Sequence, residues 1–206
     1  MLSFSHRMTR LRLFIAISSP VQSHAAVAGI RQELEPRLDK PRLSGNTTYP
    51  ASVRWTPPSQ QHFTLKFLGE TDARWVDPIV DALKNCLSDQ ASFDIECKGL
   101  GVFPDEQHAR ILWIGTGRGG DTLSTLAGKT EDGLARIGLP RADRPFEPHL
   151  TIARFKRPVN ASSMDAYLSS KDRLFLSFPV SKVSLFKSDL RADGPIHTEL
   201  AAIPLS

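Results

Sequence analysis

HFTLKFLG, at residues 62–69, places a histidine and a threonine two positions apart at the start of an apolar run, and HLTIARFK repeats this arrangement at residues 149–156. On a β-strand, residues i and i+2 point to the same face. Each run therefore presents an imidazole beside a hydroxyl, while the apolar residues between them pack behind. If the two strands lie near one another, His62, Thr64, His149 and Thr151 face one shared cleft.

This set of side chains favours acid–base chemistry on a phosphate. Two imidazoles that titrate near neutrality can serve as acid and base in one turnover, which predicts a bell-shaped pH profile. The threonine hydroxyls can donate hydrogen bonds to phosphate oxygens, and Arg154 can add positive charge. On a regular strand the odd spacing from His149 points Arg154 to the opposite face, so its use requires a twist or bulge. A lone strand histidine is more often a packing residue, but two copies in matching apolar contexts favour function.

Other kinds of site receive little support from the sequence. Two histidines without a carboxylate at ligand spacing make a poor metal set, and no local motif indicates a Ser-His-Asp or Cys-His arrangement. Cys86 and Cys97 have no C-x-x-C spacing, so we expect packing residues in a reducing, cytoplasmic protein with neither metal nor cofactor. His6, His24, His108 and His197 have no comparable context, and we expect surface or structural roles for them.

The charge distribution favours an anionic ligand. The net charge of +4 and the pI near 9.3 are mild, but basic residues gather beside both motifs. These residues are Arg37, Lys40, Arg42 and Arg54 before the first motif, and Arg141, Arg144, Arg154, Lys156 and Arg157 around the second. The longest apolar run, residues 13–17, is too short to span a bilayer, so we expect no membrane segment.

The apolar pattern predicts alternating strands and helices. Strands are expected at 10–18, 52–55, 62–70, 92–103, 109–117, 149–155, 176–190 and 196–203, and helices at 20–38, 72–88, 119–137 and 161–171, with a loop at 39–50. Helices mixed with mostly antiparallel strands indicate an α+β fold, and the chain divides into two halves that each contribute one motif. We expect residues 1–9 to be a disordered extension and residues 10–206 to form a single domain.

With these two motifs, the sequence resembles the 2H phosphoesterase superfamily, which is defined by paired H-x-[ST]-x motifs. Within it, the chain is similar to the RNA 2′,3′-cyclic phosphodiesterases, also called the 2′-5′ RNA ligase family. The flanking segments that carry the closer resemblance are RLFIAI (12–17), HFTLKFLGE (62–70), GVFP (101–104), ARILWIG (109–115), PHLTIARF (148–155) and VSLFKSDLRADGP (183–195).

The resemblance implies a bilobal fold with two pseudo-symmetric lobes of mostly antiparallel sheet, outer helices and a central cleft. It implies metal-free hydrolysis of an RNA-terminal 2′,3′-cyclic phosphate to a 2′-phosphate. By motif position, His62 would protonate the departing 3′-oxygen and His149 would activate water. Thr64, Thr151 and Arg154 would hold phosphate oxygens. His197 stands where the family tends to have tyrosine, and we expect that position to be peripheral.

Several alternatives stay open at this point. Related enzymes act on small cyclic phosphates, including ADP-ribose 1″,2″-cyclic phosphate, or on 2′-5′ linked oligonucleotides, and weak reverse ligation of RNA ends uses the same catalyst. A non-catalytic module that binds RNA ends or nucleotides, or a domain whose histidines only pack, would also carry these residues. Phe14, Trp55, Phe103 and Trp113 are candidates for base stacking, although each is more typical of a core. We expect a monomer.

Overall fold

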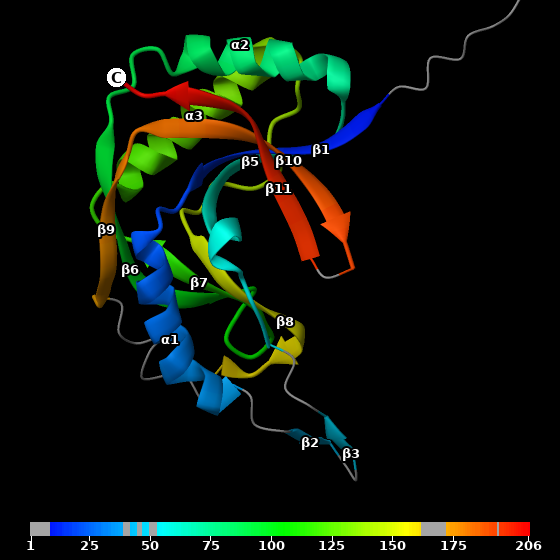
Figure 1. Cartoon of the computed structure of the whole chain (residues 1–206), viewed down its shortest axis with the longest axis vertical. Coiled ribbons are helices and arrows are strands. Elements are labelled where there is room, and N and C mark those ends of the chain that lie inside the picture. Colours follow the sequence, from blue (N-terminus) through cyan, green and yellow to red (C-terminus); the bar gives the residue numbers. More distant parts are fainter. Residues whose placement is uncertain (1–8, 39–41, 45–46, 50–52, 162–171, 193) are drawn as a thin grey trace, which may run out of the picture.

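The computed structural model describes residues 9–38, 42–44, 47–49, 53–161, 172–192 and 194–206. In this part of the chain a nine-stranded, strongly curled sheet carries three α-helices (Figure 1). The strands of the sheet are β1 (Arg10–Ser18), β4 (Val53–Trp55), β5 (His62–Asp72), β6 (Phe93–Phe103), β7 (Ala109–Thr116), β8 (Leu150–Val159), β9 (Leu174–Val180), β10 (Lys182–Arg191) and β11 (Gly194–Pro204). The helices are α1 (Gln22–Leu38), α2 (Val76–Cys86) and α3 (Gly120–Arg136), with short 3₁₀ turns at Pro58–Gln60 and Ala73–Trp75.

The two motif strands are neighbours in the middle of this sheet. The strand order is β11-β10-β1-β5-β8-β7-β6-β9, with β4 added to β8, and every pair is antiparallel. The halves meet where β5 and β8 pair through one described register pair, Phe63 with Leu150. Each of these residues stands between the histidine and the threonine of its motif. The α+β class and the antiparallel sheet are thus confirmed.

The helices bury an apolar face of each half of the sheet. Helices α2 and α3 lie together across the half that contains β1 and β5, whereas α1 lies beside the other half against β9 (Figure 1). Val27, Ile30, Leu34 and Leu38 of α1 are all buried, as their spacing predicts. Full burial of a Leu or Ile side chain contributes about 1.5 to 3 kcal/mol, so this stripe stabilises the helix more than its intrinsic propensity does.

Side chains from β1 alternate between two separate clusters. Leu13, Ile15 and Ile17 join the main core with the helices, while Phe14 and Ala16 form a small second cluster with Phe186 of β10 on the other face. Both faces of β1 are therefore buried. The second cluster lies on the same side as His62, whose ring contacts Phe14.

Three expected elements differ from the structure. The stretch at 39–50 contains a short hairpin, β2 (Arg42–Ser44) with β3 (Thr47–Tyr49), instead of loop alone. The single strand expected at 176–190 is two strands with different partners, since β9 pairs with β6 and β10 pairs with β1 and β11. Helix α1 begins at Gln22, after Ser19 and Pro20. The helix expected at 161–171 falls almost wholly outside the described residues, as do residues 1–8.

Candidate active site

Each motif histidine is fixed by a backbone carbonyl two residues before it. Nδ1 of His62 lies 2.7 Å from the carbonyl oxygen of Gln60, and Nδ1 of His149 lies 2.7 Å from that of Glu147. A carbonyl oxygen can only accept, so Nδ1 carries the proton in both rings. Nε2 of each ring is therefore the atom left to accept or donate a proton towards a ligand. The two motifs thus share the same hydrogen bond from Nδ1 to a carbonyl two residues earlier.

The surroundings disfavour the charged form of both imidazoles in the ligand-free protein. Burial lowers the pKa of His62 to about 4 against the opposing hydrogen bond to Gln60, and the positive charges of His197, Arg154 and His149 lower it further. Burial also lowers the pKa of His149, and Arg154 adds to this effect, while the hydrogen bond and carboxylate of Glu147 oppose it. A bound phosphate would raise both pKa values, because an anion favours the charged imidazolium.

Both motif strands bulge directly after the threonine. In β5, Ala16 pairs with Thr64 and Ile15 with Lys66, so Leu65 is an extra residue. In β8, Trp113 pairs with Thr151 and Leu112 with Ala153, so Ile152 is an extra residue. A bulge shifts the alternation of side chains by one position. In both strands two buried residues then follow one another before an exposed one.

The bulge in β8 brings Arg154 to the side of the sheet that carries the motif. Ile152 and Ala153 are both fully buried, and Arg154 is exposed. The sequence spacing required a twist or bulge before Arg154 could lie beside His149 and Thr151, and β8 contains such a bulge. The positive charge of Arg154 acts on both His62 and His149, which places the guanidinium close to the two imidazoles. Phe67, 66% exposed, holds the corresponding position on β5.

Aromatic rings pack against both histidines. The ring centroid of Phe14 lies 4.9 Å from that of His62, and the centroid of Phe103 lies 5.0 Å from that of His149, edge-on. Trp113 lies 6.3 Å from His149. Three of the four aromatic residues singled out in the sequence thus border the site. The fourth, Trp55, packs under the guanidinium of Arg31.

His197 of β11 is the residue that sequence reasoning missed. Its ring centroid lies 5.5 Å from that of His62, with the two planes nearly perpendicular, and 4.8 Å from that of Phe14. The expectation of a peripheral position is therefore wrong. The one signal in the sequence was the histidine itself, at a position where the resembling family tends to have tyrosine. Strand β11 reaches this region because it pairs with β10, which in turn pairs with β1, the strand that carries Phe14.

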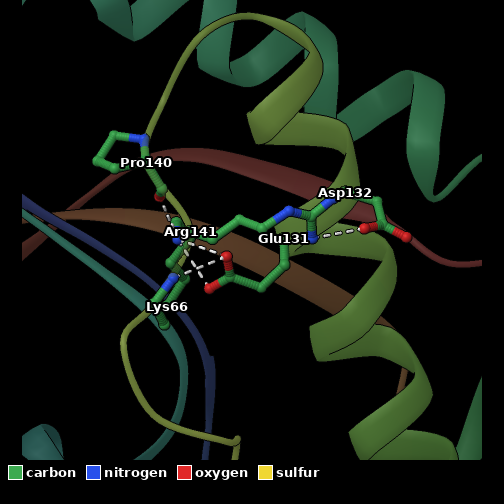
Figure 2. Close-up of polar contacts among 6 residues, drawn as sticks. Lys66, Glu131, Asp132, Pro140 and Arg141 are labelled. Atoms are coloured by element: carbon green, nitrogen blue, oxygen red, sulfur yellow. Dashed lines mark hydrogen bonds and ion pairs between the residues drawn. The ribbon is translucent and has the colours of Figure 1, made fainter.

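A buried ion pair connects β5, which carries the first motif, to α3 and to the loop that precedes the second motif (Figure 2). The bulge turns Lys66 inwards, where Nζ lies 2.7 Å from both carboxylate oxygens of Glu131 and 2.9 Å from the carbonyl of Pro140. The backbone N–H of Ala142 donates to Glu131 at 3.2 Å. We call Lys66, Glu131, Pro140 and Ala142 the latch. It holds the loop before His149 against β5.

The described residues were also compared with the requirements of a metal site, a reactive thiol and a membrane-spanning helix. Among them, no three His, Cys, Asp or Glu side chains gather as metal ligands would. Cys86 and Cys97 are free, and burial raises the pKa of both thiols. No described helix has the length and apolar character needed to cross a membrane.

Comparison with known proteins gives consistent results. The sequence profile of the 2′-5′ RNA ligase superfamily matches residues 30–192. A Methanothermobacter thermautotrophicus protein named RNA 2′,3′-cyclic phosphodiesterase is 31% identical over 156 residues, which is 75% of this chain and 84% of that protein. An Aquifex aeolicus protein of the same name is 34% identical over 147 residues, which is 70% of this chain and 78% of that protein.

Solved structures share the fold along almost the whole chain. The Thermus thermophilus protein TT0787 superposes with a TM-score of 0.76 at 26% identity, covering 95% of this chain and 98% of its own. Escherichia coli LigT in complex with 3′-AMP superposes with a TM-score of 0.73 at 21% identity, covering 96% and 99%. The likeness to LigT extends to the curled sheet and its helices.

Proposed function

The chain belongs to the 2′-5′ RNA ligase superfamily, and on that basis we propose that it is a phosphodiesterase that opens an RNA-terminal 2′,3′-cyclic phosphate to a 2′-phosphate. The observation that carries the proposal is the pair of imidazoles on adjacent strands, each with Nδ1 tied to a carbonyl and Nε2 left for a ligand. The names of the relatives supply the class of substrate.

The proposed reaction is an in-line displacement at phosphorus. His149 accepts a proton from water at Nε2 while the water oxygen forms a bond to phosphorus. The bond from phosphorus to the 3′-oxygen breaks, and His62 gives that oxygen its Nε2 proton. Attack and departure take place on opposite sides of phosphorus, so the two groups must stand on opposite sides of the ligand. The proposal therefore assigns one histidine from each half of the sheet to each side of the phosphorus.

The remaining motif residues would bind the phosphate oxygens. Thr64 and Thr151 project from the same strand faces as the histidines and can donate hydrogen bonds to the two non-bridging oxygens. Arg154 supplies a positive charge that stays in place as negative charge builds on these oxygens. The roles of His62 and His149 follow the motif order, and the near-symmetry of the two sites makes the regiochemistry of the product the decisive test.

A short RNA that ends in a 2′,3′-cyclic phosphate tests the proposal. The parent, His62→Ala and His149→Ala are incubated with it in EDTA, and the product end is identified as 2′- or 3′-phosphate. His108→Ala serves as the matched control, because His108 is an exposed histidine outside both motifs whose ring pairs with Asp105. We expect a 2′-phosphate from the parent and the control, and a loss of at least about a hundredfold in the two motif variants.

Two outcomes would count against the proposal. An intact RNA substrate with folded parent protein would exclude an RNA phosphodiesterase. Turnover of a free cyclic mononucleotide in the same assay would then point to small cyclic phosphates. A 3′-phosphate product would reverse the proposed choice of leaving oxygen.

A further inference from the structure

Gln60, at the end of the 3₁₀ turn before β5, connects the ring of His62 to β11, a strand that is distant in sequence. Nδ1 of His62 is bonded to the carbonyl of Gln60, and the side chain of the same glutamine donates from Nε2 to the carbonyl of Pro195 on β11, at 2.5 Å. His197 follows Pro195 by two residues. Gln60 therefore fixes both the motif histidine and the start of the strand that carries the third histidine.

The rings of His62, His197 and Phe14 pack against one another in pairs. Phe14 is 3% exposed and touches both imidazoles, at 4.9 and 4.8 Å between centroids. The rings of His197 and His62 lie edge to face, with an interplanar angle of 88°. An edge-to-face arrangement of this kind is favourable between aromatic rings and sets their relative tilt. Nδ1 of His197 is buried without a hydrogen-bond partner.

Burial lowers the pKa of His197 and disfavours its charged form. The acidic groups on the same hairpin have basic or hydroxyl partners of their own. Glu199, two residues along β11, is held by Lys182 and Ser184, while Asp189 on β10 is held by Lys187. Arg12, Glu70 and Asp189 line a hollow along β1, β5 and β10. The other charged or titratable groups that act on His62 are the positive Arg154 and the second motif histidine, His149.

We propose that His197 is a positioning residue for the reaction: its ring, seated against Phe14, holds the plane of the His62 imidazole so that Nε2 points at the departing oxygen. The carbonyl of Gln60 fixes which nitrogen faces the ligand, and His197 fixes the tilt of the ring about that bond. The functional part of this inference rests on the proposed role of His62, whereas the ring contact does not.

The test combines a titration with kinetics on three variants. His197→Ala removes the ring, His197→Phe keeps the ring without its nitrogens, and His108→Ala is an exposed-histidine control. The protonation of His62 is followed by NMR of its ring nitrogens in the ligand-free protein, which requires no activity. The kcat and KM are measured with RNA that ends in a 2′,3′-cyclic phosphate.

We expect His197→Ala to raise the pKa of His62 from about 4 towards its ordinary value, because water reaches the ring and one positive neighbour is lost. Its kcat should fall about tenfold with little change in KM, since misorientation affects the transition state more than binding. His197→Phe should recover most of the lost kcat. The control should match the parent in every measurement.

The possible outcomes test the positioning role of His197 separately from the proposed phosphodiesterase activity. An unchanged titration of His62 in His197→Ala would overturn the ring contact. A changed titration with an unchanged kcat, or a His197→Phe variant as slow as the alanine variant, would overturn the positioning role. If the parent opens no cyclic phosphate but His62 still responds to His197, the proposed function fails, and with it the catalytic interpretation of the contact.

Discussion

The imidazoles of His62 and His149 are held as near copies, each bonded through Nδ1 to a carbonyl two residues earlier. Gln60 ends a 3₁₀ turn and Glu147 lies in an irregular stretch, so the same bond forms after two different backbone conformations. The two rings differ in their neighbours. His62 has His197 against it, and burial takes its pKa to about 4, whereas the Glu147 carboxylate opposes the lowering at His149.

The lowered pKa values predict an acid-shifted rate profile. The kcat/KM reports the free enzyme, which must hold one proton on the histidine pair, so its bell should peak below pH 6.5. The bound phosphate raises both pKa values, so the kcat profile should lie at higher pH. Steady-state rates between pH 3.5 and 8.5 measure both curves. A kcat/KM maximum above pH 7 would contradict the prediction.

Arg154 should contribute through its charge and its planar donors. Arg154→Met should lower kcat/KM by about 10² to 10³, as for loss of other donors aimed at developing charge. Arg154→Lys should recover only part, because an ammonium cannot bind two oxygens side by side. Arg136→Met, which changes the same charge on the exposed end of α3, is the control. Equal effects at the two positions would show a general charge effect.

Among the elements, the bulges in β5 and β8 do most to shape the site. Each follows its threonine by one residue and turns the next two side chains into the core. One bulge buries Lys66 beside Glu131, and the other exposes Arg154 next to the motif. The same irregularity thus produces a structural residue on one strand and a ligand-binding candidate on the other.

Loss of half of the latch should destabilise the fold. Lys66→Met leaves the Glu131 carboxylate buried without its partner, since the two side chains are 3% and 17% exposed, and should cost about 3 to 5 kcal/mol in urea unfolding. The double variant Lys66→Met/Glu131→Leu should recover much of that loss. Lys84→Met breaks an exposed pair with Asp81 and should cost less than about 1 kcal/mol. A cost for Lys66→Met as small as that of Lys84→Met would exclude a structural role for the latch.

Several elements followed directly from the sequence, and the failures share one cause. The sequence predicts β1, α1 and both motif strands because the apolar pattern of each element shows which of its side chains are buried. The bulges, the division between β9 and β10, and the position of His197 were not, because each depends on which strand lies alongside. The apolar pattern of one strand does not record the register of its partner.

The whole molecule should lose stability as the pH falls through the histidine range. His62 has a folded pKa of about 4 against 6.5 in the unfolded chain, so the unfolded state binds more protons between these values. Stability contributed through His62 is therefore full above pH 6.5 and falls towards pH 4, by about 3 kcal/mol in all. Burial lowers the pKa of His149 and His197 in the same direction.

Urea unfolding at pH 7 and pH 4.5 measures this effect. The parent should lose about 2 to 3 kcal/mol more than His62→Gln over that interval, because glutamine does not titrate. His108→Ala, which lacks an exposed histidine, should behave as the parent does. An equal loss in the parent and in His62→Gln would mean that His62 is not kept neutral by folding.

The seam between the two halves of the sheet has a mechanical consequence. Phe63 and Leu150 form the described register pair that joins β5 to β8, and each lies directly beside a motif histidine. In any rotation about a pivot, displacement grows with distance from the axis. Swinging one half against the other about this seam would therefore move the far edge strand β9 most and the two imidazoles least. The separation between the two motif histidines would then stay nearly constant while the far edge of the sheet moves.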